Sequence, residues 1–373
     1  MRFMITLVLS LLPAAAASGQ NITYLHDGID RQYRIHIPDG VPESAHLVLA
    51  LHGYGGTNNG MMNNYGWVQL ADERGFVVAF PNGTRDQWNS RFWDVGYDFH
   101  AGLDIDDDGF LTALALHLQE LHGLDENKTF VTGFSNGADM CFQLACREPE
   151  TFMAFAPIIG TMMDTLYTTC VPAINRSILA MNATDDTTTL YEGDMDNSDG
   201  WGAYRSIPDV MAFWATVLGV PDMEQTYLPD TNPNDGSTVQ LDVYRSPDHN
   251  LELRHYLVLG GGHDWPGQSG NMDIDATLEA WNFFDSLSGG CVGSDINTDG
   301  LINVTDVLLL IGDWGTPYDV TDLLSLLEQW GLACSGACCL SNGNCVYIDA
   351  PACEASGGSW NGSSSSCTVV NCP

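Results

Sequence analysis

Residues 133–137 read G-x-S-x-G, a serine with a glycine two positions away on each side. The preceding residues 128–132 form a mainly apolar run typical of a buried strand, and residues 138–146 have the composition of a helix. A serine at the sharp turn between a strand and a helix exposes its hydroxyl at the top of a sheet. The flanking glycines leave room for this strained turn, because a Cβ at either position would crowd the strand against the helix. The pattern therefore predicts that Ser135 is a nucleophile.

A base and an orienting acid must accompany this serine, because a serine hydroxyl is a weak nucleophile. In chains of this order the acid follows the serine and the histidine comes last, each on a loop after a strand. His263 fits the base, since it lies in a glycine-rich turn directly after a predicted strand at 256–259. The acid position falls on two adjacent aspartates, Asp185 and Asp186, after another predicted strand. Either aspartate could orient the imidazole, and we favour Asp186.

Acyl transfer also needs two backbone N–H groups aimed at the developing oxyanion. One would come from Asn136, the residue after the nucleophile. The other would come from residues 52–56, which read H-G-Y-G-G after a predicted strand at 46–51, and we expect it to be the amide of Tyr54. The alternative is a glycine-rich turn without this role. The position of residues 52–56, after the third strand and before the nucleophile, favours the oxyanion role.

Strands and helices alternate along the part of the chain that carries these residues. An antiparallel hairpin at the sheet edge is expected at 22–38. Short continuous apolar runs indicate strands that are covered on both faces. Such strands are expected at 46–51, 76–80, 177–181 and 256–259, and helices at 109–121, 210–218 and 275–287. The pattern predicts the α/β class, an α/β-hydrolase fold with a mostly parallel sheet between helices.

The charge of the chain excludes some partners. Twelve basic residues against 48 acidic ones give a net charge of −36, which argues against nucleic acid or an anionic membrane as a partner. The chain begins with a basic residue, a short apolar stretch and several alanines, the pattern of a secretory signal peptide over residues 1–19. No later segment has membrane-spanning length. We therefore expect an exported protein, secreted or attached to the cell surface.

Eleven cysteines in an exported chain are read as disulfides. Three of them precede residue 290 and eight follow it, which indicates one large core-stabilised domain followed by small domains that need cross-links. The expected organisation is a signal peptide at 1–19, a hydrolase domain at 20–290, a calcium-binding module at 291–334 and a cysteine-rich module at 335–373.

Several motifs, in order, resemble the secreted polyhydroxybutyrate-depolymerase-type esterases, a family similar to the feruloyl and acetylxylan esterases of carbohydrate esterase family 1. The matching segments are 27–34, 51–56, 81–84, 91–93, 107–110, 132–137, 206–214 and 261–267. The resemblance covers nearly all of residues 22–287. It implies a serine carboxylic-ester hydrolase that acts through an acyl-enzyme, needs no cofactor for catalysis, and takes polyhydroxyalkanoate esters. Alternatives are a feruloyl or acetylxylan esterase, or a catalytically silent secreted binding protein.

The resemblance also implies roles for individual residues. It makes Ser135 the nucleophile and His263 the base. The family frame H-G-T-x-D-x-x-x-x-Y supports Asp186 as the acid, although this chain has Asn and Ala in place of the family's His and Gly. Cys146 and Cys170 lie beside one apolar segment where the family often pairs cysteines, which implies a disulfide and leaves Cys141 as a buried free thiol.

Three tryptophans are candidates for contact with the substrate. Trp201, Trp265 and Trp93, together with Tyr54, would line a pocket for the acyl or aryl part of a polymeric or aryl ester. The alternative for each tryptophan is packing in the core.

Residues 295–306 have the pattern of a twelve-residue calcium loop with a glycine at its sixth position, and they resemble the dockerin type I loop. A helix is expected at 307–315. The half-repeat at 319–331 lacks the D-x-N-x-D-G segment, so one Ca²⁺ site is expected. The expected ligands are Asp295, Asn297, Asp299, Leu301, Asn303 and Asp306. Such a module binds a cohesin-like or cell-surface partner, or serves as a spacer.

The last module, from residue 335, holds six cysteines in under forty residues after a change to Gly- and Ser-rich composition. This predicts a knot of three disulfides whose connectivity the sequence does not select.

Overall fold

The structure is a computed structural model. It describes residues 19–42, 44–103, 105–246, 249–288, 304–312, 335–339, 345–349, 353 and 357–360. The predicted signal peptide, except its last residue, and the first nine residues of the predicted calcium loop lie outside these ranges. In the described part, no helix combines the length and the apolar character needed to cross a membrane.

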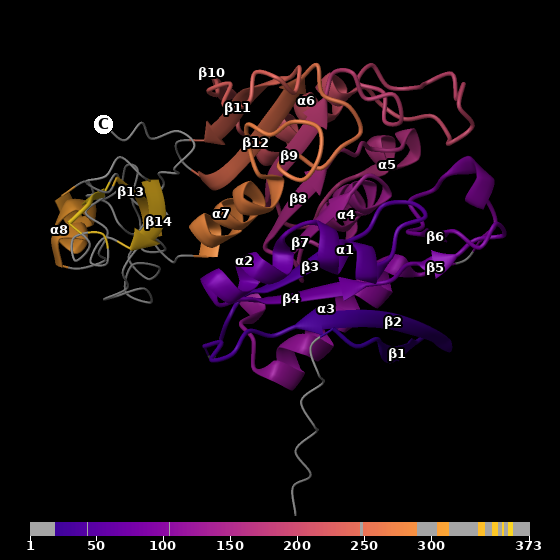
Figure 1. The fold of residues 1–373 in the computed structure, drawn as a ribbon, viewed down its shortest axis with the longest axis horizontal. Helices are drawn as coiled ribbons and strands as arrows, with labels where there is room; N and C mark the ends of the chain where they lie inside the picture. Colours follow the sequence, from indigo (N-terminus) through magenta and orange to yellow (C-terminus); the bar gives the residue numbers. More distant parts are fainter. Residues whose placement is uncertain are drawn as a thin grey trace, which may run out of the picture.

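A ten-stranded sheet forms the centre of the part of the structure between residues 19 and 288 (Figure 1). Its six central strands are parallel, and an antiparallel pair extends it at each edge. In sheet order the strands are β1 (Ile22–His26), β2 (Ile29–His36), β4 (Val77–Pro81), β3 (Leu47–Leu51), β7 (Thr129–Phe134), β8 (Ala154–Ile158), β9 (Ser177–Ala183), β12 (His249–Leu259), β11 (Thr238–Ser246) and β10 (Asp222–Tyr227). The mostly parallel sheet and the β1–β2 edge hairpin are as predicted.

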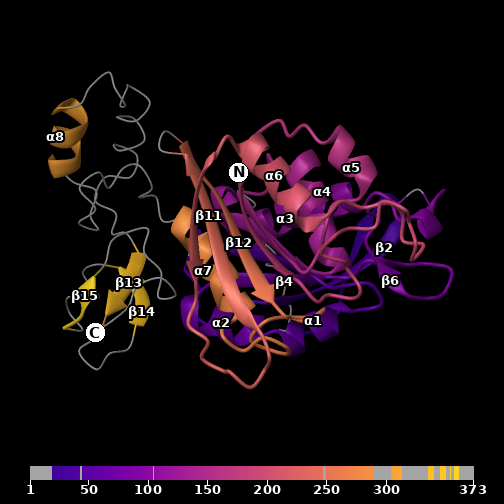
Figure 2. The same cartoon turned by 90° about the horizontal axis from the view of Figure 1, so that it is seen from above.

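Helices cover both faces of this sheet, and Figure 2 shows the two layers. On one face pack α3 (Asp107–His122), α4 (Asn136–Arg147), α5 (Asp164–Thr169) and α6 (Ile207–Leu218). On the other face pack α1 (Asn58–Asn64), α2 (Trp67–Arg74) and α7 (Ala276–Ser288). The shorter elements are β5 (Thr84–Arg85), β6 (Arg91–Phe92) and the 3₁₀ turns η1 (Asp98–His100) and η2 (Glu126–Lys128).

Apolar side chains of the central strands divide between two cores. In β3, every residue is buried. Leu47, Leu49 and Leu51 join the core under α3 and α4, while Val48 and Ala50 join the core under α2 and α7. This alternation follows from the two-residue period of a strand. It explains why the strands appear in the sequence as continuous apolar runs.

Cysteine pairing in the hydrolase domain agrees with the prediction. Cys146, at the end of α4, forms a disulfide with Cys170, which follows α5, with 5.3 Å between their Cα atoms. Cys141 is a buried free thiol, and burial raises its pKa well above the usual value. This thiol therefore stays protonated and acts as a small packing residue.

The two small modules are described only in part. A helix, α8 (Val304–Gly312), begins three residues before the predicted helix at 307–315 and so includes the last residues of the predicted loop. In the last module, β13 (Ser335–Cys339), β14 (Cys345–Asp349) and β15 (Ser359–Trp360) form an antiparallel sheet that the cysteine pattern did not predict. Cys339 and Cys353 are both disulfide-bonded.

Candidate active site

Ser135 lies at the turn between β7 and α4, at the N-cap of the helix. Its backbone has φ 55° and ψ −120°, a conformation that L-residues rarely adopt. A Cβ on Gly137 would lie 2.6 Å from the carbonyl oxygen of Leu51, and a Cβ on Gly133 would overlap the Gly137 backbone. The two glycines thus let the helix approach the strands closely enough to hold the strained turn, as the motif predicts.

Three side chains from remote chain positions form one hydrogen-bonded row. The Ser135 Oγ and His263 Nε2 atoms are 2.9 Å apart, and His263 Nδ1 lies 2.7 Å from Asp186 Oδ2. With the proton on Nδ1, the imidazole donates to the carboxylate, and Nε2 accepts from the serine hydroxyl. The residues follow β7, β12 and β9, whose carboxyl ends meet at the same edge of the sheet.

The two candidate acids have different environments. The Asp186 side chain is almost completely buried, and its Oδ1 accepts from the amides of Thr188 at 2.7 Å and Thr189 at 2.9 Å. Asp185 is exposed and accepts from the hydroxyl of Thr184. Only Asp186 contacts the imidazole, so the structure selects it from the two residues that the sequence left open.

The two backbone amides predicted as oxyanion donors lie on segments next to Ser135. The N–H of Asn136 is at the first residue of α4, where a helix leaves its amides without intrahelical acceptors. Among the described residues, the N–H of Tyr54 has no acceptor, whereas Gly55 donates to the Arg91 carbonyl and Gly56 to the Gly53 carbonyl. The sequence-predicted pair of donors therefore lies on the two segments next to Ser135.

His52 holds the loop that carries Tyr54, a role that the sequence analysis missed. Its Nδ1 donates to the Gly53 carbonyl at 2.8 Å, and its Nε2 accepts from the Gly83 amide at 3.0 Å. Burial lowers the pKa of His52 to about 4, so the ring is neutral and can accept. The histidine at the start of the H-G-Y-G-G segment could have indicated this role, but the sequence shows it only as part of the motif.

Two of the three predicted pocket tryptophans are core residues instead. Trp93 is fully buried and its indole donates to the His52 carbonyl, while its backbone exchanges two hydrogen bonds with the Asn136 side chain. Trp265 is 1% exposed and donates to the Thr277 hydroxyl. Neither is among the residues that line the two hollows at Ser135. Trp201 does line the site.

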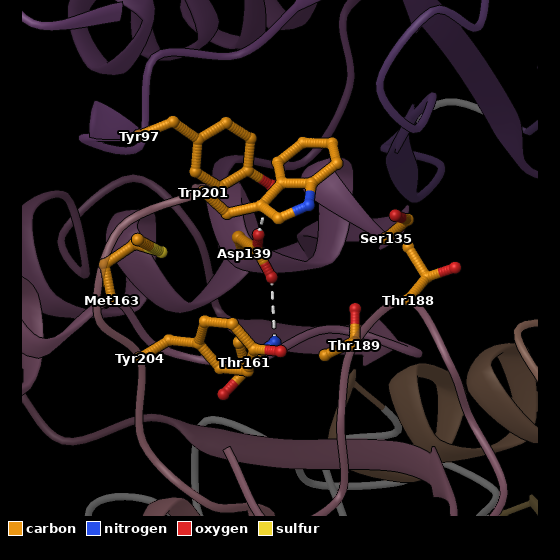
Figure 3. Close-up of a pocket in the computed structure, with 9 residues that line it drawn as sticks. All are labelled: Tyr97, Ser135, Asp139, Thr161, Met163, Thr188, Thr189, Trp201 and Tyr204. Atoms are coloured by element: carbon orange, nitrogen blue, oxygen red, sulfur yellow. Dashed lines mark hydrogen bonds between the residues drawn. The ribbon is translucent and has the colours of Figure 1, made fainter. Parts of the chain in front are cut away.

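Two hollows meet at Ser135. The smaller has a volume of about 30 Å³, and its lining is drawn in Figure 3. It is lined by Tyr97, Ser135, Asp139, Thr161, Met163, Thr188, Thr189, Trp201 and Tyr204. The larger has a volume of about 440 Å³. It is lined by residues 52–57 and by Tyr65, Phe134 and His263, among others. Ser135, Thr188 and Trp201 belong to both, so the nucleophile stands at the boundary between the hollows.

Known proteins similar to this chain are esterases. A family model described as Esterase PHB depolymerase matches residues 31–210. The chain is 25% identical over 256 residues to the putative esterase NocK of Nocardia uniformis subsp. tsuyamanensis, covering 64% of this chain and 72% of that protein. It is 24% identical to poly(3-hydroxyalkanoate) depolymerase C of Paucimonas lemoignei, covering 63% of this chain and 58% of that protein.

A probable feruloyl esterase C of Aspergillus oryzae is 23% identical, with 70% of this chain and 86% of that protein covered. Among solved structures, an acetyl xylan esterase from Aspergillus awamori superimposes with a TM-score of 0.50 at 18% identity, covering 71% of this chain and 98% of that one. This structural likeness shows the α/β-hydrolase fold. Together with the esterase relatives, it defines the protein as a carboxylic ester hydrolase of that fold.

Proposed function

We propose that the protein is a serine hydrolase that cleaves carboxylic esters through an acyl-enzyme on Ser135. The observation that carries the proposal is the hydrogen-bonded row, with 2.9 Å from Ser135 to His263 and 2.7 Å from His263 to Asp186. His263 Nε2 takes the serine proton as Oγ attacks the ester carbonyl, and the amides of Tyr54 and Asn136 stabilise the oxyanion. The imidazolium then protonates the leaving alcohol oxygen, and water activated by His263 releases the acid.

The two hollows indicate where the alcohol part and the acyl part of the ester would bind. The leaving oxygen must lie within reach of His263 Nε2, and His263 lines only the larger hollow. The alcohol part of the ester therefore occupies the larger hollow, and the acyl part occupies the smaller one. A compartment of about 30 Å³ holds only a few non-hydrogen atoms, since about 10–15 Å³ on this measure holds one water. It suits a short acyl group and leaves little space for an aromatic one.

We propose esters of short hydroxyalkanoates, of the poly(3-hydroxybutyrate) type, as the substrate. The similarity to a poly(3-hydroxyalkanoate) depolymerase and the small acyl compartment both support this choice. An acetyl ester of a polysaccharide is the second candidate, because an acetyl group also fits the compartment. Comparing activity on poly(3-hydroxybutyrate) film, acetylated xylan and methyl ferulate tests the substrate class. Hydrolysis of methyl ferulate alone would contradict both candidates.

Replacement of the nucleophile tests the reaction itself. We expect Ser135→Ala to lower kcat/KM for p-nitrophenyl butyrate by at least about 10⁴-fold, because the acyl-enzyme cannot form. The melting temperature should change little, and the exposed Ser269→Ala serves as the matched control with full activity. A fluorophosphonate probe should label the wild type and not the Ser135→Ala variant. A folded wild type that resists the probe would favour the catalytically silent binding protein.

We also propose that the protein is exported. The sequence pattern of residues 1–19 supports this, and so does the Cys146–Cys170 disulfide, because such bonds persist in oxidising compartments. Detection of the mature chain in the culture medium, with its new N-terminus near residue 20, is the measurement that checks export.

A further inference from the structure

An acidic side chain lies in the acyl compartment. Asp139 is one helical turn beyond Ser135, and its amide donates to the Ser135 carbonyl at 3.0 Å. Ser135 is the N-cap residue of α4, and Asp139 lies in the first turn of that helix. Both residues line the smaller hollow, and Figure 3 shows the Asp139 carboxyl between Tyr97 and Thr161. In the sequence, Asp139 lies in the predicted helix at 138–146, and no motif indicates a role for it.

The Asp139 carboxylate has few donors for its charge. Its Oδ2 accepts from the Tyr97 hydroxyl at 2.6 Å, and its Oδ1 accepts from the Thr161 amide at 2.8 Å. The hydroxyl of Thr161 donates to the Arg205 carbonyl instead. Among the described residues, no ion pair involves Asp139. Because each carboxylate oxygen can accept two hydrogen bonds, acceptor capacity remains on both atoms.

Because Asp139 is buried, a further hydrogen bond to its carboxylate is strongly favourable. Asp139 is 6% exposed, and burial raises the pKa of its carboxyl to about 6. Above that pH the side chain is a buried anion without a cationic partner, which strongly favours any further hydrogen-bond donor. An apolar acyl group would displace water from the carboxylate and supply no donor. A hydroxylated acyl group would replace that water with its own hydroxyl.

We propose that Asp139 is a specificity residue that selects acyl groups with a hydroxyl on the carbon β to the ester carbonyl. The inference rests on the proposed nucleophilic role of Ser135. An acyl group on Ser135 Oγ extends into the smaller hollow, and a β-hydroxyl lies three bonds beyond the carbonyl carbon. Ser135 and Asp139 both line this small hollow, so the hydroxyl can meet the carboxylate within it. The hydroxyl donates a hydrogen bond to the Asp139 carboxylate, without proton transfer, and no covalent bond is made or broken.

Two esters with one carbon skeleton test this proposal on the wild-type enzyme. At pH 8, kcat/KM for p-nitrophenyl (R)-3-hydroxybutyrate should exceed that for p-nitrophenyl butyrate by at least about tenfold, because a site built to bind a hydroxyl discriminates against its absence. A ratio near or below one overturns the proposal without any variant. If Ser135→Ala hydrolyses both esters at the wild-type rate, the proposed function fails instead.

Variants then assign the discrimination to the carboxylate. Asp139→Leu should bring the ratio of the two kcat/KM values to about one, and Asp139→Asn should lower it by several-fold, because an amide oxygen is a weaker acceptor. Tyr97→Phe is the matched control, since it removes a hydroxyl partner of Asp139 and keeps the carboxylate, so the preference should persist. If Asp139 had a purely structural role, its variants would lower kcat/KM for both esters by the same factor. That outcome overturns the proposal.

Discussion

Asp185 and Asp186 are neighbours in the chain, but their side chains have different surroundings. One is exposed on the loop after β9, and the other is buried with three hydrogen-bond contacts, one of them to His263. The two residues have the same side chain, so chemistry alone does not decide which one contacts His263. Asp186 makes this contact because its position, one residue further along the loop, turns its side chain toward the imidazole.

At this scale we predict that Asp186→Asn lowers kcat/KM on the order of 10⁴-fold, because an amide favours the wrong tautomer of His263. Asp185→Asn is the matched control and should stay within about twofold, since it makes no contact with the row. Steady-state kinetics with p-nitrophenyl butyrate measures both. Equal losses in the two variants would contradict the assignment.

Single residues also differ in how far the sequence predicts their positions. Ser135 and His263 were predictable because strained turns and glycine-rich loops leave a local pattern. Asp139 and His52 were not, because their roles depend on burial and on partners from other elements, such as Tyr97 and Gly83. The same holds for Trp93, since nothing in its neighbours along the chain distinguishes a core ring from a pocket ring.

Among the elements, the turn between β7 and α4 depends most on close packing. Its helix begins against the end of β3, and its glycines make that contact possible. The strained backbone of Ser135 is held by packing on both sides. Activity and stability should therefore fail together when this contact is disturbed.

We predict that Gly137→Ala lowers the free energy of unfolding by at least about 2 kcal/mol, because its Cβ would lie 2.6 Å from the Leu51 carbonyl oxygen. Gly60→Ala in α1 is the matched control, since its Cβ meets ordinary contact distances and alanine favours a helix by up to about 1 kcal/mol. Urea denaturation monitored by circular dichroism compares the two. Similar stability of both variants would show that the turn is not tightly packed.

Among the edge strands, the β1–β2 hairpin was predicted, whereas the β10–β11 pair was not. The central strands are buried on both faces and appear as apolar runs. β10 is almost entirely exposed, and its residues D-M-E-Q-T-Y show neither an apolar run nor a clear alternation. It forms because β11 offers a free edge, which is a property of the assembled sheet and not of the segment.

Across the whole molecule, titration of buried groups links stability to pH. His255 in β12 is buried, and its Nε2 has no hydrogen-bond partner. Burial lowers its pKa from 6.5 to about 4. Between these values the unfolded chain binds a proton that the folded chain does not. The contribution of His255 to stability is therefore complete above about pH 6.5 and is lost as the pH falls toward 4.

We predict that His255→Leu gains stability relative to the wild type on acidification, by up to about 3 kcal/mol between pH 7.5 and 4.5. The measurement is the difference in melting temperature at both pH values. Asn282→Leu is the matched control, because Asn282 is also buried with an unpartnered oxygen but does not titrate. Parallel pH profiles of wild type and His255→Leu would contradict the lowered pKa.

If the smaller hollow holds the acyl group, as proposed, its size has a consequence for polyester substrates. Its walls include Tyr97, Met163 and Tyr204, and it holds only a few atoms beyond the reacting carbonyl. Such a space leaves little room for a long polyester chain to continue, so on the proposed substrate we expect the last unit, with its free alcohol, to enter. The proposed enzyme would then trim a polyester from one terminus and release single units, while the average length of the remaining chains would decline slowly.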